Sequence, residues 1–147
     1  KQTIENHKKY NNLIKGFDLV GEEDRGHSLL YYLDTLLYGY NYISRLNDSS
    51  FNFVFHSGET NLPNDVQPSL YGDDVSSLEN LFDAILLKSK RIGHGIGLIK
   101  YPELYKYLIK NKIAIEVCPS SNKILGIIRM IFLELTLSFI VFQRFFL

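Results

Sequence analysis

Short strand-like and helix-like runs alternate along this chain, and their order limits the possible folds more than any other feature. The strand-like runs carry β-branched, aromatic or other apolar residues, and the runs between them space apolar residues as a helix does. The strand-like runs are residues 16–21, 51–56, 91–93 and 113–117, and the helical runs are residues 29–37, 76–87 and 102–110. Such alternation predicts an α/β fold with a parallel sheet and right-handed crossovers. The pattern alone leaves a barrel and an open sheet both possible.

The segments around these runs are less regular. We expect residues 1–13 to hold the end of a helix. Residues 38–50 are tyrosine-rich and then polar, and we expect a loop there; residues 61–74 contain two prolines and predict an irregular surface loop. Asp18 falls inside a predicted buried strand, where an unpaired charge is costly. The sequence therefore predicts a partner for Asp18.

The second strand-like run ends in a group of residues suited to chemistry. Phenylalanines alternate with Asn, Val and His over residues 51–56, which is strand periodicity. Gly58 follows, and glycine permits a sharp turn that would bring Glu59 back to the side where His56 points. In α/β folds, ligands bind at the carboxyl ends of strands. Taken alone, however, His-x-x-Glu also fits a strand that simply ends in a polar turn.

Several motifs in a fixed order identify a family that the chain resembles. They read HSGET at residues 56–60, DAILL at 83–87, RIGHG at 91–95 and IEVCPSSN at 115–122. In this order and spacing they resemble the adenosine deaminases. GFDLVGEEDRGHSL, upstream of them, narrows the resemblance to the secreted adenosine-deaminase-related growth factors. The joint occurrence of several motifs makes the resemblance specific, and it covers roughly residues 11–125.

The resemblance carries expectations about fold and function. It implies a (β/α)8 barrel, of which this chain would hold about four consecutive βα units, the family's fourth to seventh strands. It implies zinc-dependent hydrolytic deamination of adenosine, and of 2'-deoxyadenosine, to inosine and ammonia. It also implies an extracellular protein, with a homodimer possible in the full-length family. Deamination of another aminopurine, such as adenine or adenosine monophosphate, is the alternative within enzymes.

The resemblance assigns roles to four residues. His56 falls on a zinc-ligand position, Glu59 on the proton donor to the purine ring, and His94 on the base that handles the proton of the metal-bound water. Gly21 matches the family's backbone contact to the nucleoside. Each has a structural alternative: a core histidine for His56, a solvated turn carboxylate for Glu59, a surface turn residue for His94 and a tight strand-to-loop turn for Gly21.

Neighbouring polar residues are expected to have plainer roles. Glu23, Asp24 and His27 follow the first strand-like run, and we interpret them as a solvated acidic turn. Ser121 or Asn122 is expected to cap the helix that follows the fourth strand-like run.

The chain also departs from the family pattern. The family takes two zinc ligands from a His-x-His on its first strand, and no such pair occurs here; His7 and His27 stand alone. Its Asp-Asp pair lies on the last strand, whereas Asp73 and Asp74 follow the second strand-like run. One histidine does not fix zinc tightly. The alternative to an enzyme is therefore a catalytically dead remnant that binds nucleoside or acts as a growth-factor-like protein.

Composition limits the classes of protein and of partner that remain possible. The 147 residues are enough for one core, and 46% hydrophobic content fits a globular protein. The net charge is zero, so we expect no nucleic-acid partner. Cys118 is the only cysteine, which excludes an intrachain disulfide, and we expect it to pack as a small core residue. No leader sequence opens the chain, so we expect no signal peptide in it.

The last segment, residues 126–147, is apolar and does not match the family. We therefore divide the chain into a partial deaminase domain, residues 1–125, and this tail. Its apolar part is shorter than the ~20 residues of a membrane span, so a membrane partner is not expected. A helix covering the sheet, a weak membrane anchor and translated non-coding sequence remain possible. We favour the last, with a helical shape.

Overall fold

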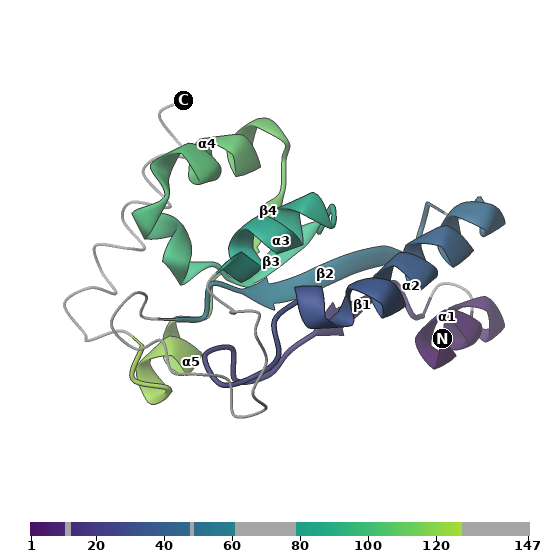
Figure 1. Cartoon of the computed structure of the whole chain (residues 1–147), viewed down its shortest axis with the longest axis horizontal. Coiled ribbons are helices and arrows are strands. Elements are labelled where there is room, and N and C mark those ends of the chain that lie inside the picture. The colour runs from purple at the N-terminus through teal and green to yellow at the C-terminus, as the bar shows by residue number, and fades with distance from the viewer. Residues whose placement is uncertain (11–12, 48, 61–78, 128–147) are drawn as a thin grey trace.

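The computed structural model describes residues 1–10, 13–47, 49–60 and 79–127, and helices alternate with strands throughout (Figure 1). The elements in chain order are α1 Gln2–Lys9, β1 Gly16–Leu19, the 3-10 helix η1 Leu30–Tyr32, α2 Leu33–Leu46, β2 Asn52–Ser57, α3 Asn80–Leu86, β3 Arg91–His94, the 3-10 helix η3 Ile96–Lys100, α4 Pro102–Lys110, β4 Ala114–Glu116 and α5 Pro119–Ile124.

The four strands form one parallel sheet in the order β1-β2-β3-β4. Neighbouring strands in the sheet are also consecutive along the chain, with helices between them. This is the order of consecutive βα units in a barrel, and it confirms the predicted α/β fold as part of a (β/α)8 barrel. The register sets Phe55 beside Ile92, His56 beside Gly93, and Gly93 beside Glu116. The carboxyl ends of the four parallel strands therefore lie together at one end of the sheet.

Strand β2 has the two faces that its sequence predicts. Phe53 and Phe55 are buried, and their rings pack 6.3 Å apart between centroids. They belong to a core cluster built by α1, α2 and β2, to which Ile4 of α1 contributes. His56 points to the opposite side from the phenylalanines. One strand thus supplies both a core face and a polar face.

Helix α2 is longer than predicted, because residues 38–50 do not form one loop. The helix continues to Leu46, and Gly39 and Ile43 are buried on its inner face. The ring of Tyr40 stacks on Phe53 with centroids 4.0 Å apart, and its hydroxyl donates a hydrogen bond to the Leu87 carbonyl. Burial raises the pKa of Tyr40 to about 12. Packing against β2 therefore stabilises a helix where the tyrosine-rich composition favoured a loop.

A second core cluster is built by α3, β3, η3 and α4. Leu81, Ile92, Leu98 and Leu108 are buried there. Helix α4 begins at Pro102, as predicted, since proline suits the first turn of a helix. Strand β1 is only partly buried, and the prediction of a buried strand is wrong there. Asp18 nevertheless has the predicted partner, because its Oδ2 lies 2.8 Å from Arg91 Nη2.

Some predictions lie outside the described residues. These are the irregular loop at residues 61–74 and residues 128–147 of the tail, and the boundary at residue 126 stays a prediction. Within the described ranges, no helix is both long enough and apolar enough to cross a bilayer.

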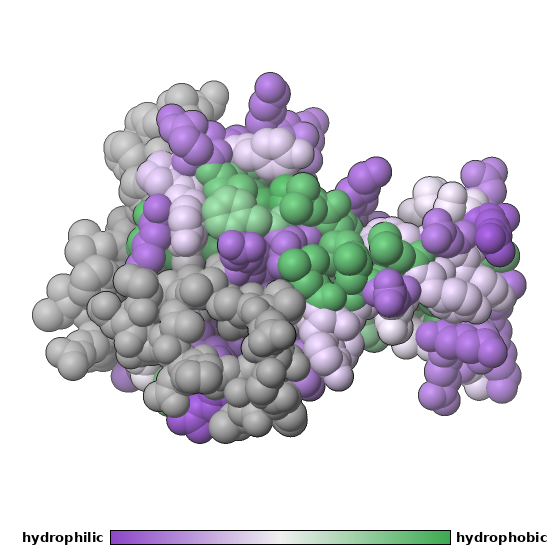
Figure 2. Space-filling model, viewed as in Figure 1, coloured by the Kyte–Doolittle hydropathy of each residue, from purple (hydrophilic) through white to green (hydrophobic). Residues whose placement is uncertain are grey.

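We predict that the isolated chain associates with itself in solution. Within the described part of the sheet, β1 and β4 each pair with one strand, so each presents an edge able to pair with another chain. Figure 2 shows apolar side chains gathered over one face, and Phe82, Leu86 and Tyr107 of α3 and α4 are among the exposed apolar residues. Size-exclusion chromatography with light scattering of residues 1–147 should give oligomers or aggregates. A monodisperse, soluble monomer would contradict this prediction.

Candidate active site at the carboxyl ends of the strands

Three residues from neighbouring segments meet where β2 and β3 end. His56 lies near the end of β2, Glu59 follows the turn, and His94 ends β3. Gly58 has φ +73°, and this turn brings Glu59 back over the sheet edge. Oε1 of Glu59 lies 3.3 Å from Nδ1 of His94, and the two imidazole centroids are 5.3 Å apart. The structure therefore brings together the three side chains that the sequence singled out.

Asp18, on the neighbouring strand, lies within ion-pair distance of the imidazole of His56, although Nδ1 of His56 makes no hydrogen bond among the described residues. Oδ2 of Asp18 lies 3.0 Å from Nδ1 of His56, and Oδ1 accepts a hydrogen bond from the His56 backbone amide at 3.2 Å. Arg91 pairs with the same Asp18 oxygen and, through Nη2, with Glu116 at 3.0 Å. An acidic neighbour at Nδ1 favours the proton on that nitrogen, which leaves a lone pair on Nε2 of His56.

Gly93 makes room for His56. A Cβ at this position would lie 2.8 Å from Cγ of His56, closer than such atoms approach. The imidazole therefore rests directly on the β3 backbone, and only glycine permits this contact.

His94 combines an unusual backbone conformation with a side-chain partner that the sequence did not reveal. Its φ is +63°, in the left-handed region that costs energy for residues other than glycine. Nδ1 of His94 lies 2.6 Å from Oδ1 of Asn122, and both side chains are buried. The amide oxygen accepts the Nδ1 proton, so Nε2 keeps a lone pair for a proton from elsewhere.

The predicted cap on α5 is wrong. Cys118 is the N-cap residue, and no side chain caps this helix. Asn122 lies inside the helix and contacts His94 instead. A hint was available, because asparagine is unfavourable inside a helix and needs a reason to be there.

The Glu59 carboxyl is nearly enclosed, with 10% of its side chain exposed. Burial raises its pKa above the usual value, and the nearby imidazoles of His94 and His56 oppose this rise. A carboxyl with a raised pKa holds its proton longer and is able to donate it.

Glu23 does not belong to a solvated turn, and this prediction is wrong. Its carboxylate accepts hydrogen bonds from the backbone amides of Gly58 and Glu59 and from the Asn80 side chain. Burial raises the pKa of Glu23, and these hydrogen bonds oppose the rise. His27 is not simply solvated either, since its ring stacks on Tyr31 with centroids 3.8 Å apart.

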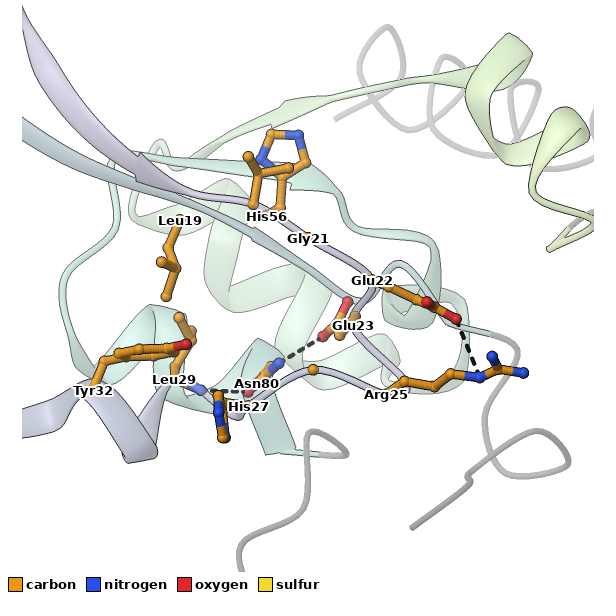
Figure 3. A pocket seen from close by; sticks show the side chains of 12 residues that line it. Leu19, Gly21, Glu22, Glu23, Arg25, His27, Leu29, Tyr32, His56 and Asn80 are labelled. Carbon is orange, nitrogen blue, oxygen red and sulfur yellow. Dashed lines mark hydrogen bonds and ion pairs between the residues drawn. The ribbon is translucent and has the colours of Figure 1, made fainter. Parts of the chain in front are cut away.

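A cavity of about 250 Å³ opens beside His56 (Figure 3). Its walls include Gly21, Glu23, Tyr32, His56 and Asn80. Nothing lies within 4 Å of the position that a Cβ on Gly21 would occupy, and its φ is not positive. The backbone at Gly21 is therefore open to a ligand, and no left-handed turn explains the glycine.

The described residues do not assemble a complete metal site. In the described ranges, no group of three or more His, Cys, Asp or Glu side chains is arranged so that it could hold a metal ion. His7 is buried elsewhere, with Nδ1 2.6 Å from the Ile14 carbonyl oxygen. Burial raises the pKa of the Cys118 thiol, which disfavours the thiolate form that metals bind. His56, the zinc-ligand position that the resemblance implies, lies at the described site. Asp73 and Asp74 lie outside the described residues.

Comparison with known sequences agrees with these motifs. The sequence profile described as adenosine deaminase matches residues 1–132. Adenosine deaminase of Lutzomyia longipalpis is 41% identical over 122 residues, which are 83% of this chain and 20% of that protein.

Two further relatives carry the name adenosine deaminase 2. The Dictyostelium discoideum protein is 43% identical over 121 residues, covering 80% of this chain and 19% of the relative. The Homo sapiens protein is 38% identical over 120 residues, which are 82% of this chain and 20% of the relative. This chain thus spans about a fifth of the length of the curated relatives it matches. With the parallel sheet, the motifs and the profile in agreement, the chain belongs to the adenosine deaminase family.

Proposed function

We propose that this chain supplies part of the active site of a zinc-dependent enzyme that hydrolyses adenosine, and 2'-deoxyadenosine, to the inosine product and ammonia. The observation that carries the proposal is a buried carboxyl with a raised pKa, Glu59, placed 3.3 Å from an imidazole at the carboxyl ends of adjacent strands. Family membership and the names of the relatives support it.

Glu59 is proposed to act as the acid. Hydrolysis adds a water oxygen to the ring carbon that bears the amino group, and electron density moves onto the adjacent ring nitrogen. A proton from the Glu59 carboxyl neutralises that nitrogen as the carbon–oxygen bond forms. The raised pKa of Glu59 favours this donation.

His94 is proposed to act as the base. Asn122 occupies its Nδ1, so Nε2 is the nitrogen able to take a proton from the attacking water. His94 then passes this proton to the amino group, the carbon–nitrogen bond breaks, and ammonia leaves. The proton on the added oxygen returns to Glu59 as the new carbonyl forms. The left-handed backbone at His94 fixes where this imidazole points.

Zinc is proposed to bind His56 together with ligands that the described residues do not contain. Catalytic zinc takes three protein ligands and leaves one position for water, whose pKa it lowers to about 7. Among the described residues, His56 alone does not fit such an ion. The Asp18 contact at Nδ1 suits a ligand that binds through Nε2.

Gly21 is proposed to contact the nucleoside through its backbone, and Gly21→Ala tests this. The added methyl meets open space, so the melting temperature should stay within a few degrees of the wild-type value. The methyl would, however, enter the cavity beside His56. We expect the KM for adenosine to rise about tenfold, which corresponds to ~1.4 kcal/mol of lost binding. An unchanged KM would contradict the assigned contact.

The second candidate function is a non-catalytic nucleoside binder, favoured because the described residues contain no group of His, Cys, Asp or Glu side chains that could hold a metal ion. A chimera separates the two candidates: residues 1–127 of this chain replace the matching segment of the Dictyostelium relative, which supplies the rest of a barrel. Calorimetry with adenosine, with and without Zn²⁺, is combined with measurement of inosine. Zinc-dependent inosine formation supports the enzyme, and saturable binding without inosine supports the binder.

Three narrower predictions accompany the proposal. Competition among adenosine, adenine and adenosine monophosphate in the chimera assay tests the choice of aminopurine. The extracellular location and the homodimer that the resemblance implies stay predictions. Detection of the gene product in culture medium, and its mass in solution, test them.

A further inference from the structure

We propose that Glu23 is a positioning residue for Glu59, a role that rests on the proposed function. Glu23 lies after β1, in the segment that leads away from the first strand. Oε2 of Glu23 accepts the backbone amide of Glu59 at 2.5 Å, and Oε1 accepts that of Gly58 at 3.0 Å. One carboxylate thus binds both amides of the turn that carries the acid.

Asn80 fixes the carboxylate of Glu23 from a third element (Figure 3). Its Nδ2 donates to Oε1 of Glu23 at 3.1 Å, while its Oδ1 accepts the Leu29 backbone amide at 2.9 Å. The Leu29 bond settles which end of the Asn80 amide faces Glu23. Two segments remote in sequence, the turn after β2 and the start of α3, therefore converge on Glu23 in the segment after β1.

The turn is held from its other side as well. The Gly97 amide donates to the Gly58 carbonyl at 3.0 Å, and the Gly95 amide donates to the Ser57 carbonyl at 3.1 Å. The carbonyls thus bind the segment after β3, and the amides bind Glu23. Removing the Glu23 carboxylate would release the backbone amides of Gly58 and Glu59, and the Glu59 side chain faces His94.

Glu23 supports the acid and does not replace it. Its two oxygens already accept three hydrogen bonds, whereas Glu59 lies against His94. A glutamine at position 23 would offer one acceptor oxygen to two backbone donors and would turn an amide toward other donors. An aspartate would keep the negative charge, but its shorter side chain would place the carboxylate one methylene farther from the two turn amides. Both substitutions should therefore release the turn.

Hydrogen exchange tests the contact directly. Amide exchange of the Gly58 and Glu59 amides is measured by mass spectrometry on the full 147-residue chain and on the chimera. Glu22→Gln is the matched control, because it removes the same charge from the adjacent residue, whose side chain is 67% exposed and pairs with Arg25. We expect Glu23→Gln to speed exchange at the two amides by at least about tenfold and Glu22→Gln to leave it unchanged. Equal exchange in wild type and Glu23→Gln would overturn the proposal.

Kinetics of the chimera test the consequence. Glu23→Gln and Glu23→Asp should lower kcat about 100-fold, as expected when a reacting group moves by about 1 Å, while KM stays within threefold. A purely structural role would lower the melting temperature and the amount of folded enzyme without this split between kcat and KM. A wild-type kcat in both variants would refute the positioning role. If the chimera is inactive with Glu23 in place, the proposed function fails, and the exchange result still decides whether Glu23 holds the turn.

Discussion

Glu59→Gln is expected to lower adenosine turnover by the chimera about 10²- to 10⁴-fold, the range typical of general acid–base groups. The glutamine amide keeps the shape of the side chain but cannot donate a proton as a carboxylic acid does. Because the acid form of Glu59 is required, wild-type turnover should also fall as pH rises through the raised pKa of this group. Steady-state kinetics, followed by the absorbance change from adenosine to inosine, measure both effects.

Glu22→Gln provides the control for this prediction. It removes one carboxylate from the wall of the cavity beside His56, but this side chain is exposed and pairs with Arg25. We expect its kcat to match that of the wild-type chimera. Turnover by Glu59→Gln within a factor of a few of wild type, in a folded protein, would refute the assignment of Glu59 as the acid.

Gly93→Ala is expected to cause the second large loss, because the new methyl would lie 2.8 Å from Cγ of His56. Either the imidazole or the β3 backbone must move, and overpacking of this kind costs about 1–3 kcal/mol of stability. Displacing His56 should also reduce turnover and zinc retention, and we expect at least about a 100-fold loss of kcat. Melting temperature, kcat and zinc content by mass spectrometry of the purified chimera are the measurements.

Gly21→Ala is the matched control for Gly93→Ala. Both add one methyl to a glycine near the cavity, but at Gly21 the methyl meets nothing within 4 Å. We expect Gly21→Ala to keep zinc and stability and to change KM alone. Full zinc content and wild-type kcat in Gly93→Ala would show that His56 does not depend on this close approach.

The parts of the fold that local pattern determines could be predicted from the sequence. Alternating phenylalanines identified β2, and Pro102 marked the start of α4. Gly58 predicted the turn after β2, and this turn places Glu59 beside His94. These features arise from backbone preferences and side-chain periodicity within a few residues.

The contacts that local pattern does not determine were missed. Helix α2 extends to Leu46 because Tyr40 packs on β2, a contact that composition does not encode. Glu23 binds an amide 36 residues away, and Asn122 binds a histidine 28 residues away. Nothing in the local sequence distinguishes Glu23 from the exposed Glu22 beside it. Such partners follow from the order of strands in the sheet, so they appear only once the sheet is assembled.

Adenosine turnover by the chimera tests the central claim most directly, because it asks whether the His56, Glu59 and His94 of this chain serve in a complete barrel. We predict a kcat within about tenfold of the intact Dictyostelium relative, a difference of about 1.4 kcal/mol in activation free energy. We also predict its loss in His94→Ala. A folded, zinc-loaded chimera without turnover, or one that His94→Ala leaves fully active, would contradict the account.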